Sequence, residues 1–262
     1  MSRYARMFQR LEASGDGALG AFLMLGDPDL ETSAALLAAA VEGGADMLEV
    51  GIPFSDPVAD GPVIQAAAGR ALESGVRVAD CFALIDQVRQ RFAEIPIGIL
   101  TYANLVMAPG RSEFFRRAAA AGTDSLLIAD LPAFEAAPWA EEMREVALEP
   151  VLIAATNTPQ PTLERIAGIG GAYTYCVTRA GVTGAGGQAA FDSNLIERLR
   201  SAGAPPPVFG FGISCADQVS AAIAAGAAGA ISGSAIVQAA ARAGEDAVRT
   251  LVVDLKAGTR RG

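Results

Sequence analysis

The sequence contains no histidine, and its only lysine, Lys256, lies close to the C-terminus. These absences exclude a Ser-His-Asp triad, a histidine-ligated zinc site, and a pyridoxal phosphate or substrate imine on a core lysine. The cysteines Cys81, Cys176 and Cys215 are odd in number and widely spaced, so we predict neither a disulfide framework nor a metal site and expect small buried side chains. If the protein is an enzyme, carboxylates must transfer its protons.

Basic residues are also scarce, since 20 Lys and Arg face 29 Asp and Glu and the net charge is -9. Nucleic acid is therefore not an expected partner. The first ten residues are polar and charged, which does not suggest a secretory signal. The longest uncharged stretch, Gln218–Ala241, is rich in alanine and interrupted by glycines, so we expect no membrane span and predict a cytoplasmic protein.

The chain of 262 residues is 52% hydrophobic and 19% charged, which is enough to form a large core. Short apolar runs with high β propensity alternate along it with helical stretches. The expected strands are Ala21–Leu25, Met47–Val50, Ile97–Leu100, Ser125–Ile128, Val151–Ile153, Tyr173–Val177, Val208–Phe211 and Ala230–Ile231. The expected helices include Leu30–Glu42, Val78–Phe92, Glu113–Ala121, Phe134–Val146, Leu163–Ile169, Leu195–Arg200, Ala216–Ala225 and Ser234–Ala243.

This alternation, without a linker or a break in composition, predicts one domain over residues 1–262. The expected fold is α/β, a (β/α)8 TIM barrel with extra short helices, because strands buried on both faces read as continuous apolar runs. A doubly wound open sheet is the alternative. In a barrel, the residues that bind and react lie on the loops after the strands.

The second expected strand contains Glu49, and a stretch with three prolines and the carboxylates Asp56 and Asp60 follows it. Alternation along a strand sends Leu48 and Val50 to one side and Glu49 to the other, so Glu49 is expected to point into the barrel near its mouth. A glutamate satisfied by backbone amides is the alternative, and Asp56 or Asp60 could each be a turn former. Asp130, after the fourth expected strand, is either a third site carboxylate or the N-cap of the next helix.

Glycines cluster near the end of the chain at Gly181–Gly184, Gly210–Gly212 and Gly229–Gly233. Barrels often hold a phosphate between the last loops and a helix N-terminus, so backbone amides, Ser234 and Arg179 are candidate ligands. Plain turns are the alternative for any single glycine, and Gly210–Gly212 resembles only part of a dinucleotide fingerprint. Apolar residues at the strand ends could line a flat aromatic pocket or simply form core: Phe22, Leu100, Tyr102, Leu127, Ile153, Tyr175 and Phe211.

Five segments of the chain together resemble the tryptophan synthase alpha chain family. They are LEVGIPFSDPVADGP at Leu48–Pro62, PIGILTYANLV at Pro96–Val106, YTYCVTRAGVTGA at Tyr173–Ala185, FGFGIS at Phe209–Ser214 and GAAGAISGSAIV at Gly226–Val237. The likeness covers essentially the whole chain. It implies retro-aldol cleavage of indole-3-glycerol phosphate to indole and D-glyceraldehyde 3-phosphate.

The resemblance also implies the roles of individual residues. Glu49 and Asp60 would be the catalytic pair, with Asp60 stabilising the charge that develops at the indole N–H and Glu49 acting as general acid at C3. The phosphate would lie at Gly184, Gly212, Gly233 and Ser234. The indole would lie among Phe22, Leu100, Tyr102, Leu127, Ala129, Ile153, Tyr175, Thr183 and Phe211. Residues 178–188 would form a lid that includes Arg179 and Thr183 and is richer in glycine than is usual for the family.

Family members act as an αββα complex, so the resemblance implies a tryptophan synthase beta subunit as partner, with indole passing to it for L-tryptophan synthesis. Asp56 is the candidate cross-subunit contact. No cofactor is expected in this chain, and pyridoxal phosphate is expected only in the partner. A free-standing indole-releasing lyase and an inert protein that only activates a beta subunit are alternatives. A sugar-phosphate epimerase is disfavoured because its usual histidine is missing.

Overall fold

The computed structural model describes residues 1–177 and 191–260. Its eight strands are all parallel and form a closed barrel in chain order, with β8 paired to β1. The strands are β1 (Ala18–Met24), β2 (Met47–Gly51), β3 (Ile97–Thr101), β4 (Ser125–Ile128), β5 (Glu149–Ala155), β6 (Thr174–Val177), β7 (Pro207–Phe209) and β8 (Gly229–Ser232). The predicted TIM barrel is confirmed, and the open sheet is wrong.

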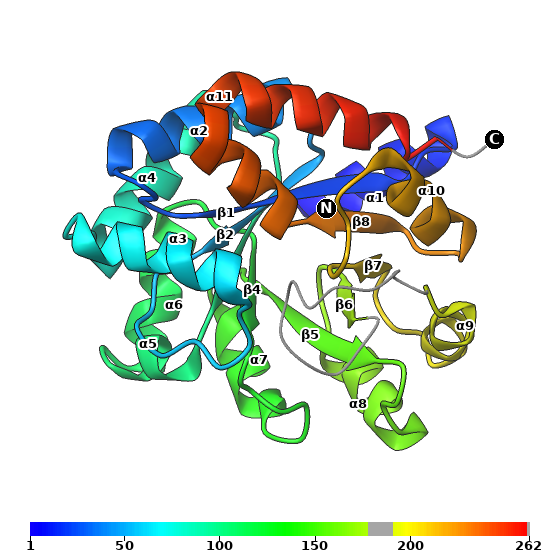
Figure 1. The fold of residues 1–262 in the computed structure, drawn as a ribbon. Coiled ribbons are helices and arrows are strands. Elements are labelled where there is room, and N and C mark those ends of the chain that lie inside the picture. Colours follow the sequence, from blue (N-terminus) through cyan, green and yellow to red (C-terminus); the bar gives the residue numbers. More distant parts are fainter. Residues whose placement is uncertain (178–190, 261–262) are drawn as a thin grey trace.

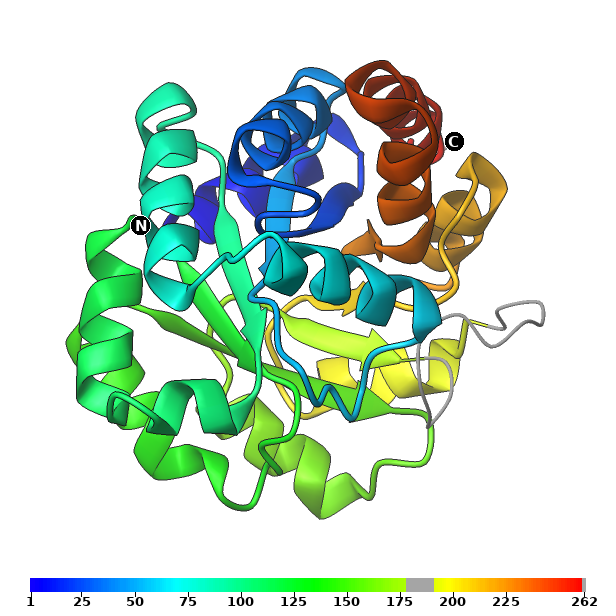
Figure 2. The ribbon, with the colours of Figure 1, turned by 60° about the vertical axis from the view of Figure 1, so that its left-hand side comes forward.

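Helices surround the strands on all sides (Figures 1 and 2). They are α1 (Arg3–Ser14), α2 (Leu30–Glu42), α3 (Pro62–Glu73), α4 (Val78–Arg91), α5 (Ala103–Met107), α6 (Arg111–Ala120), α7 (Ala136–Glu145), α8 (Gln160–Ile169), α9 (Ser193–Ser201), α10 (Ala216–Ala224) and α11 (Ser234–Ala257). Among the residues described, no helix is long and apolar enough to cross a membrane.

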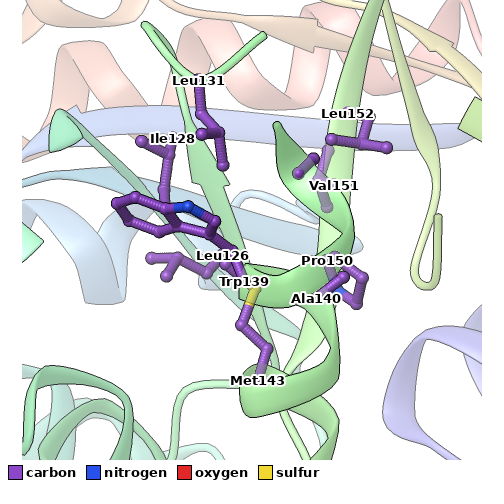
Figure 3. Close-up of a pocket in the computed structure, with 10 residues that line it drawn as sticks. Leu126, Ile128, Leu131, Trp139, Ala140, Met143, Pro150, Val151 and Leu152 are labelled. Carbon is purple, nitrogen blue, oxygen red and sulfur yellow. The ribbon is translucent and has the colours of Figure 1, made fainter. Parts of the chain in front are cut away.

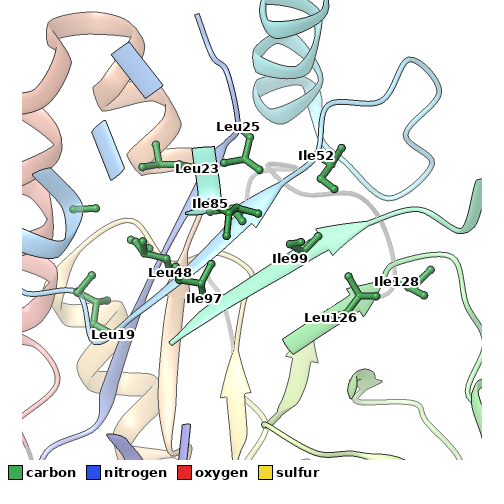
Figure 4. Close-up of a cluster of buried hydrophobic side chains, with 14 of the residues drawn as sticks. Leu19, Leu23, Leu25, Leu48, Ile52, Ile85, Ile97, Ile99, Leu126 and Ile128 are labelled. Atoms are coloured by element: carbon green, nitrogen blue, oxygen red, sulfur yellow. The ribbon is translucent and has the colours of Figure 1, made fainter. Parts of the chain in front are cut away.

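The strands are buried on both faces except at a few positions such as Ile153, which explains their continuous apolar sequences. An outer cluster, which includes Leu48, Ile97 and Ile99, lies between the strands and the helices (Figure 4). An inner cluster, which includes Phe22 and Tyr175, fills the barrel. Residues alternate between the two clusters along a strand.

The amino end of the barrel is closed by α1, whose Tyr4 belongs to the inner cluster. The Tyr4 hydroxyl accepts a hydrogen bond from Ser125 Oγ at 3.0 Å, at the first residue of β4. Lys256, the only lysine, also lies at this end, where its Nζ contacts the Asp46 carboxylate at 2.5 Å just before β2. The end opposite to the loops that follow the strands is therefore held by structural polar contacts.

Two parts of the fold differ from the sequence-based expectation. The expected helices included none directly after the second strand, but Pro62 stands at the first position of α3, where its fixed φ suits a helix start. The last helix extends to Ala257 instead of ending at Ala243, with non-helical backbone at Ala243 and Gly244. The predicted end therefore coincides with a kink, where Gly244 has a φ of 66° that favours glycine.

Candidate active site

Glu49 lies in the middle of β2, paired with Phe22 of β1 and Gly98 of β3. Its side chain is only 2% exposed, and Oε1 accepts a hydrogen bond from the Tyr173 hydroxyl at 2.8 Å. Leu48 on the same strand belongs to the outer cluster. The prediction that Glu49 points into the barrel is confirmed, and the partner found for it is a side-chain hydroxyl instead of backbone amides.

The surroundings of Glu49 favour its protonated form. Burial raises the pKa of Glu49 to about 7, the hydrogen bond from Tyr173 opposes this rise, and the negative charge of Asp60 adds to it. A carboxyl group with a pKa near neutrality can give up a proton and take one back at physiological pH. Glu49 therefore has the properties of a general acid and base.

Asp60 lies at the end of the loop that joins β2 to α3, just before the helix N-cap Gly61. Its side chain is 7% exposed, whereas Asp56 in the same loop is exposed and bonded to its neighbour Ser55. Burial raises the pKa of Asp60, and a hydrogen bond from Tyr102 opposes this rise. The structure thus separates the two aspartates: Asp60 is buried toward the barrel, and Asp56 faces solvent.

Tyr175 on β6 lies near both carboxyl groups. After burial itself, the charges of Glu49 and Asp60 are the causes that raise the pKa of Tyr175 well above its usual value. Its hydroxyl donates to the backbone oxygen of Gly210 at 3.1 Å. Glu49, Asp60 and an aromatic ring from the opposite wall therefore share one space at the carboxyl end of the barrel.

Most of the apolar residues expected around an aromatic ligand surround this same space. Phe22, Leu127 and Tyr175 belong to the inner cluster, and Leu100, Ala129 and Phe211 pack against it. Ile153 is 37% exposed although it lies on a buried strand. It is two residues beyond Val151 of the inner cluster, so it faces the open mouth of the barrel.

The glycines expected to bind phosphate lie on two neighbouring loops. Gly212 follows β7 with a φ of 77°, and Gly233 is the N-cap of α11, which begins at Ser234. The Ser232 hydroxyl donates to the backbone oxygen of Ile213 at 2.8 Å, which joins the two loops. A helix N-terminus beside a left-handed glycine offers free amides to an anion. Gly184, Arg179 and Thr183 lie outside the described residues.

Comparison with known proteins agrees with this geometry. A sequence profile described as tryptophan synthase alpha chain matches residues 8–259. A tryptophan synthase alpha chain of Shewanella amazonensis is 52% identical over 239 residues, which cover 91% of this chain and 90% of the relative. This chain belongs to the tryptophan synthase alpha chain family.

Solved structures of tryptophan synthase share the fold over nearly the whole chain. A Mycobacterium tuberculosis structure has a TM-score of 0.91 at 35% identity and covers 100% of this chain and 99% of that one. A tryptophan synthase complex from Pyrococcus furiosus has a TM-score of 0.82 at 33% identity, covering 92% and 98%. Members of the tryptophan synthase alpha family are lyases, and this chain cleaves indole-3-glycerol phosphate as they do.

The structure contradicts one of the two alternatives for Asp130, the N-cap of the next helix, and the expected burial of Cys215. Asp130 accepts a hydrogen bond from the backbone N–H of Ala103 at 2.8 Å and so caps α5 of the preceding βα unit, while Glu135 is the N-cap of α7. The capping partner is distant in sequence because neighbouring loops meet at the barrel rim. Cys215 is exposed instead of buried, since it is the N-cap residue of α10.

Tyr173 and Gln65 contact Glu49 and Asp60 but were not among the predicted site residues. Tyr173 bonds Glu49, and Gln65 Nε2 donates to the backbone oxygen of Asp60 at 2.7 Å. Tyr173 could have been predicted from the sequence, because residues two apart on a strand point the same way and Tyr175 was already expected in the pocket. No such signal existed for Gln65, whose contact depends on where α3 begins.

A separate small pocket lies between β4, β5 and α7, lined by Trp139, Met143 and Leu152 among others (Figure 3). None of the described residues that line it is charged. A phosphorylated substrate needs charged or polar groups to orient it. This pocket is therefore not an alternative active site.

Proposed function

We propose that Glu49 and Asp60 catalyse the cleavage of indole-3-glycerol phosphate without a cofactor in this chain. The observation that carries the proposal is the buried Glu49 carboxyl, whose pKa is raised to about 7 beside a second buried carboxylate. Such a pair divides acid–base work between a protonated and an ionised group.

The reaction requires a place for the electrons of the bond that breaks. Glu49 protonates C3 of the indole ring, and the resulting positive charge at the ring nitrogen is stabilised by the Asp60 carboxylate, which accepts a hydrogen bond from the N–H. The bond between C3 and the glycerol chain then breaks and its electrons restore the aromatic ring. Glu49 takes the proton from the side-chain hydroxyl, which becomes the aldehyde of glyceraldehyde 3-phosphate.

The ring acts as its own electron sink, so neither a lysine imine nor a metal is needed. Lys256 is bound to Asp46 at the far end of the barrel, where no imine could reach the mouth. Among the described residues no cluster of His, Cys, Asp and Glu could hold a metal ion. Pyridoxal phosphate is expected only in a partner subunit.

The substrate would lie with its indole in the apolar space and its phosphate at the joined loops. Phe22 lies between these two regions, because its side chain comes within 3.6 Å of the position that a side chain on Gly233 would take. Amides at Gly212, Gly233 and Ser234 would bind the phosphate. Gly184, Arg179 and Thr183 would complete the site as parts of a lid.

The partner is a tryptophan synthase beta subunit in an αββα assembly, to which indole passes. Three large apolar side chains are exposed on loops or short helices that follow β2, β3 and β4: Val58 at 71%, Met107 at 54% and Phe134 at 67%. Exposed apolar side chains near one another favour a protein interface. Asp56 in the first of these loops would contact the partner.

The test is steady-state cleavage of indole-3-glycerol phosphate by the purified chain, alone and with its beta subunit. Glu49→Gln and Asp60→Asn should each lower kcat by about a hundredfold or more, while Asp86→Asn on the exposed side of α4 is the control. Full activity in either catalytic variant would contradict the assigned role. Strong activity of the isolated chain that a beta subunit does not raise would favour a free-standing lyase.

A further inference from the structure

Tyr102 contacts both ends of the loop that carries Asp60, here residues 53–61. Its ring centroid lies 5.4 Å from that of Phe54 near the start of the loop. Its hydroxyl accepts a hydrogen bond from the backbone N–H of Ala59 at 3.3 Å near the end of the loop. Although it was expected only as a wall of the indole pocket, Tyr102 is 2% exposed and packs beneath this loop.

Gln65 holds the same loop from the other side. It stands in the first turn of α3, and its Nε2 donates to the backbone oxygen of Asp60 at 2.7 Å. Tyr102 binds the N–H of Ala59, which belongs to the peptide group between Val58 and Ala59. Side chains therefore hold one backbone group before Asp60 and the backbone oxygen of Asp60 itself. The two side chains come from different elements, the end of β3 and the start of α3.

This arrangement matters because the middle of the loop is exposed to solvent. Ser55, Asp56 and Val58 are exposed, while Asp60 is buried. A catalytic group must stay within about 0.5 Å of its productive place, which an irregular loop does not ensure without supporting side chains. The loop also stands at the surface where we place the beta subunit, so its position at Asp60 needs local support.

We propose that Tyr102 and Gln65 are positioning residues that together fix the backbone around Asp60 and so place its carboxylate for the ring N–H of the substrate. The inference rests on the catalytic role proposed for Asp60. Tyr102 also hydrogen-bonds the Asp60 carboxyl group itself, whereas Gln65 acts only through the backbone. The two residues should therefore differ in their effect on the pH dependence of the reaction.

Tyr102→Phe keeps the ring beside Phe54 and removes the hydroxyl. We expect kcat/KM to fall by about ten- to a hundredfold, the range of one hydrogen bond to a charged group. Because that bond opposes the rise in the pKa of Asp60, its loss should move the acidic limb of the pH profile to higher pH. Among the described residues, Tyr102 lowers the pKa of Asp60 through its hydrogen bond, and the charge of Asp60 raises the pKa of Glu49 and of Tyr175.

Gln65→Met keeps the length of the side chain and removes its donor. We expect kcat/KM to fall by roughly tenfold with the acidic limb unmoved, since the carboxyl group keeps its Tyr102 bond. Gln90→Met is the matched control, because Gln90 also donates its amide to an acidic residue, Asp86, but on the exposed side of α4. It should stay within about twofold of the unsubstituted chain.

Asp60→Asn must be measured in the same series. If it is inactive while Tyr102→Phe and Gln65→Met both retain full activity, the positioning role is refuted and the catalytic role of Asp60 stands. If Asp60→Asn is fully active, the proposed function of Asp60 fails, and this inference fails with it. Circular dichroism of each variant distinguishes a misplaced loop from an unfolded protein. An acidic limb that moves in Tyr102→Phe and stays in place in Gln65→Met is a result that general destabilisation would not give.

Discussion

The burial of Glu49 should lower the stability of the protein as pH rises. Its pKa is about 7 in the folded chain against 4.5 for an unperturbed glutamate, because burial disfavours the charged form. The folded state therefore binds the proton more tightly than the unfolded state. The resulting stabilisation is fully present below about pH 4.5 and is lost as pH rises through about 7.

Glu49→Gln replaces the carboxyl group with a neutral amide whose oxygen can still accept the bond from Tyr173. A pKa raised from 4.5 to about 7 corresponds to roughly 3 kcal/mol at 1.36 kcal/mol per unit. Most of this difference develops between pH 5 and pH 8. We therefore expect the inactive variant to be more stable than the unsubstituted chain at pH 8, by roughly 2 to 3 kcal/mol more than at pH 5.

The assay is urea unfolding followed by far-ultraviolet circular dichroism at pH 5 and pH 8 for both proteins. Comparing the two proteins at each pH cancels contributions from groups that Glu49 does not influence. Glu141→Gln on the exposed side of α7 controls for the substitution itself. A stability difference that is the same at both pH values would refute the raised pKa of Glu49 and the mechanism that uses it.

Two further predictions concern the walls of the site. Tyr173→Phe removes the hydrogen bond that opposes the rise in the pKa of Glu49, so the alkaline limb of the kcat/KM profile should move above about pH 7. An unmoved limb would show that the bond does not reach the carboxyl group. Gly210→Ala would place a Cβ 1.9 Å from the Tyr175 ring and should lower stability by about 1 to 3 kcal/mol and displace that ring. Gly168→Ala, with nothing within 4 Å, is its control, and equal unfolding midpoints for the two would contradict the clash.

The sequence was sufficient to predict the barrel and the direction of Glu49 because both follow from local periodicity. Strand residues alternate between two faces, so an acidic residue between Leu48 and Val50 of the outer cluster must face inward. The same alternation between the two faces of a strand places Phe22, Leu127 and Tyr175 in the inner cluster. These predictions needed no knowledge of which strands lie opposite one another.

Contacts across the barrel could not be predicted in this way. Tyr173 precedes β6, which stands on the opposite wall from β2, so its bond to Glu49 exists only once the sheet has closed. The same holds for Asp130, whose partner Ala103 begins a helix in another unit. Single residues such as these lack a sequence pattern, since their roles come from the register between distant strands.

The surroundings of Glu49 and Asp60 follow from where each residue stands in the fold. Both carboxyl groups are buried, and burial is the largest cause acting on each. Glu49 lies within a strand, surrounded by the inner cluster, and its pKa is near 7. Asp60 lies at the rim, where a loop brings the Tyr102 hydroxyl to it and limits the rise. A barrel strand and the loop that follows it can thus bring two buried carboxyl groups together, and the one on the strand has a pKa near neutrality that suits acid–base catalysis.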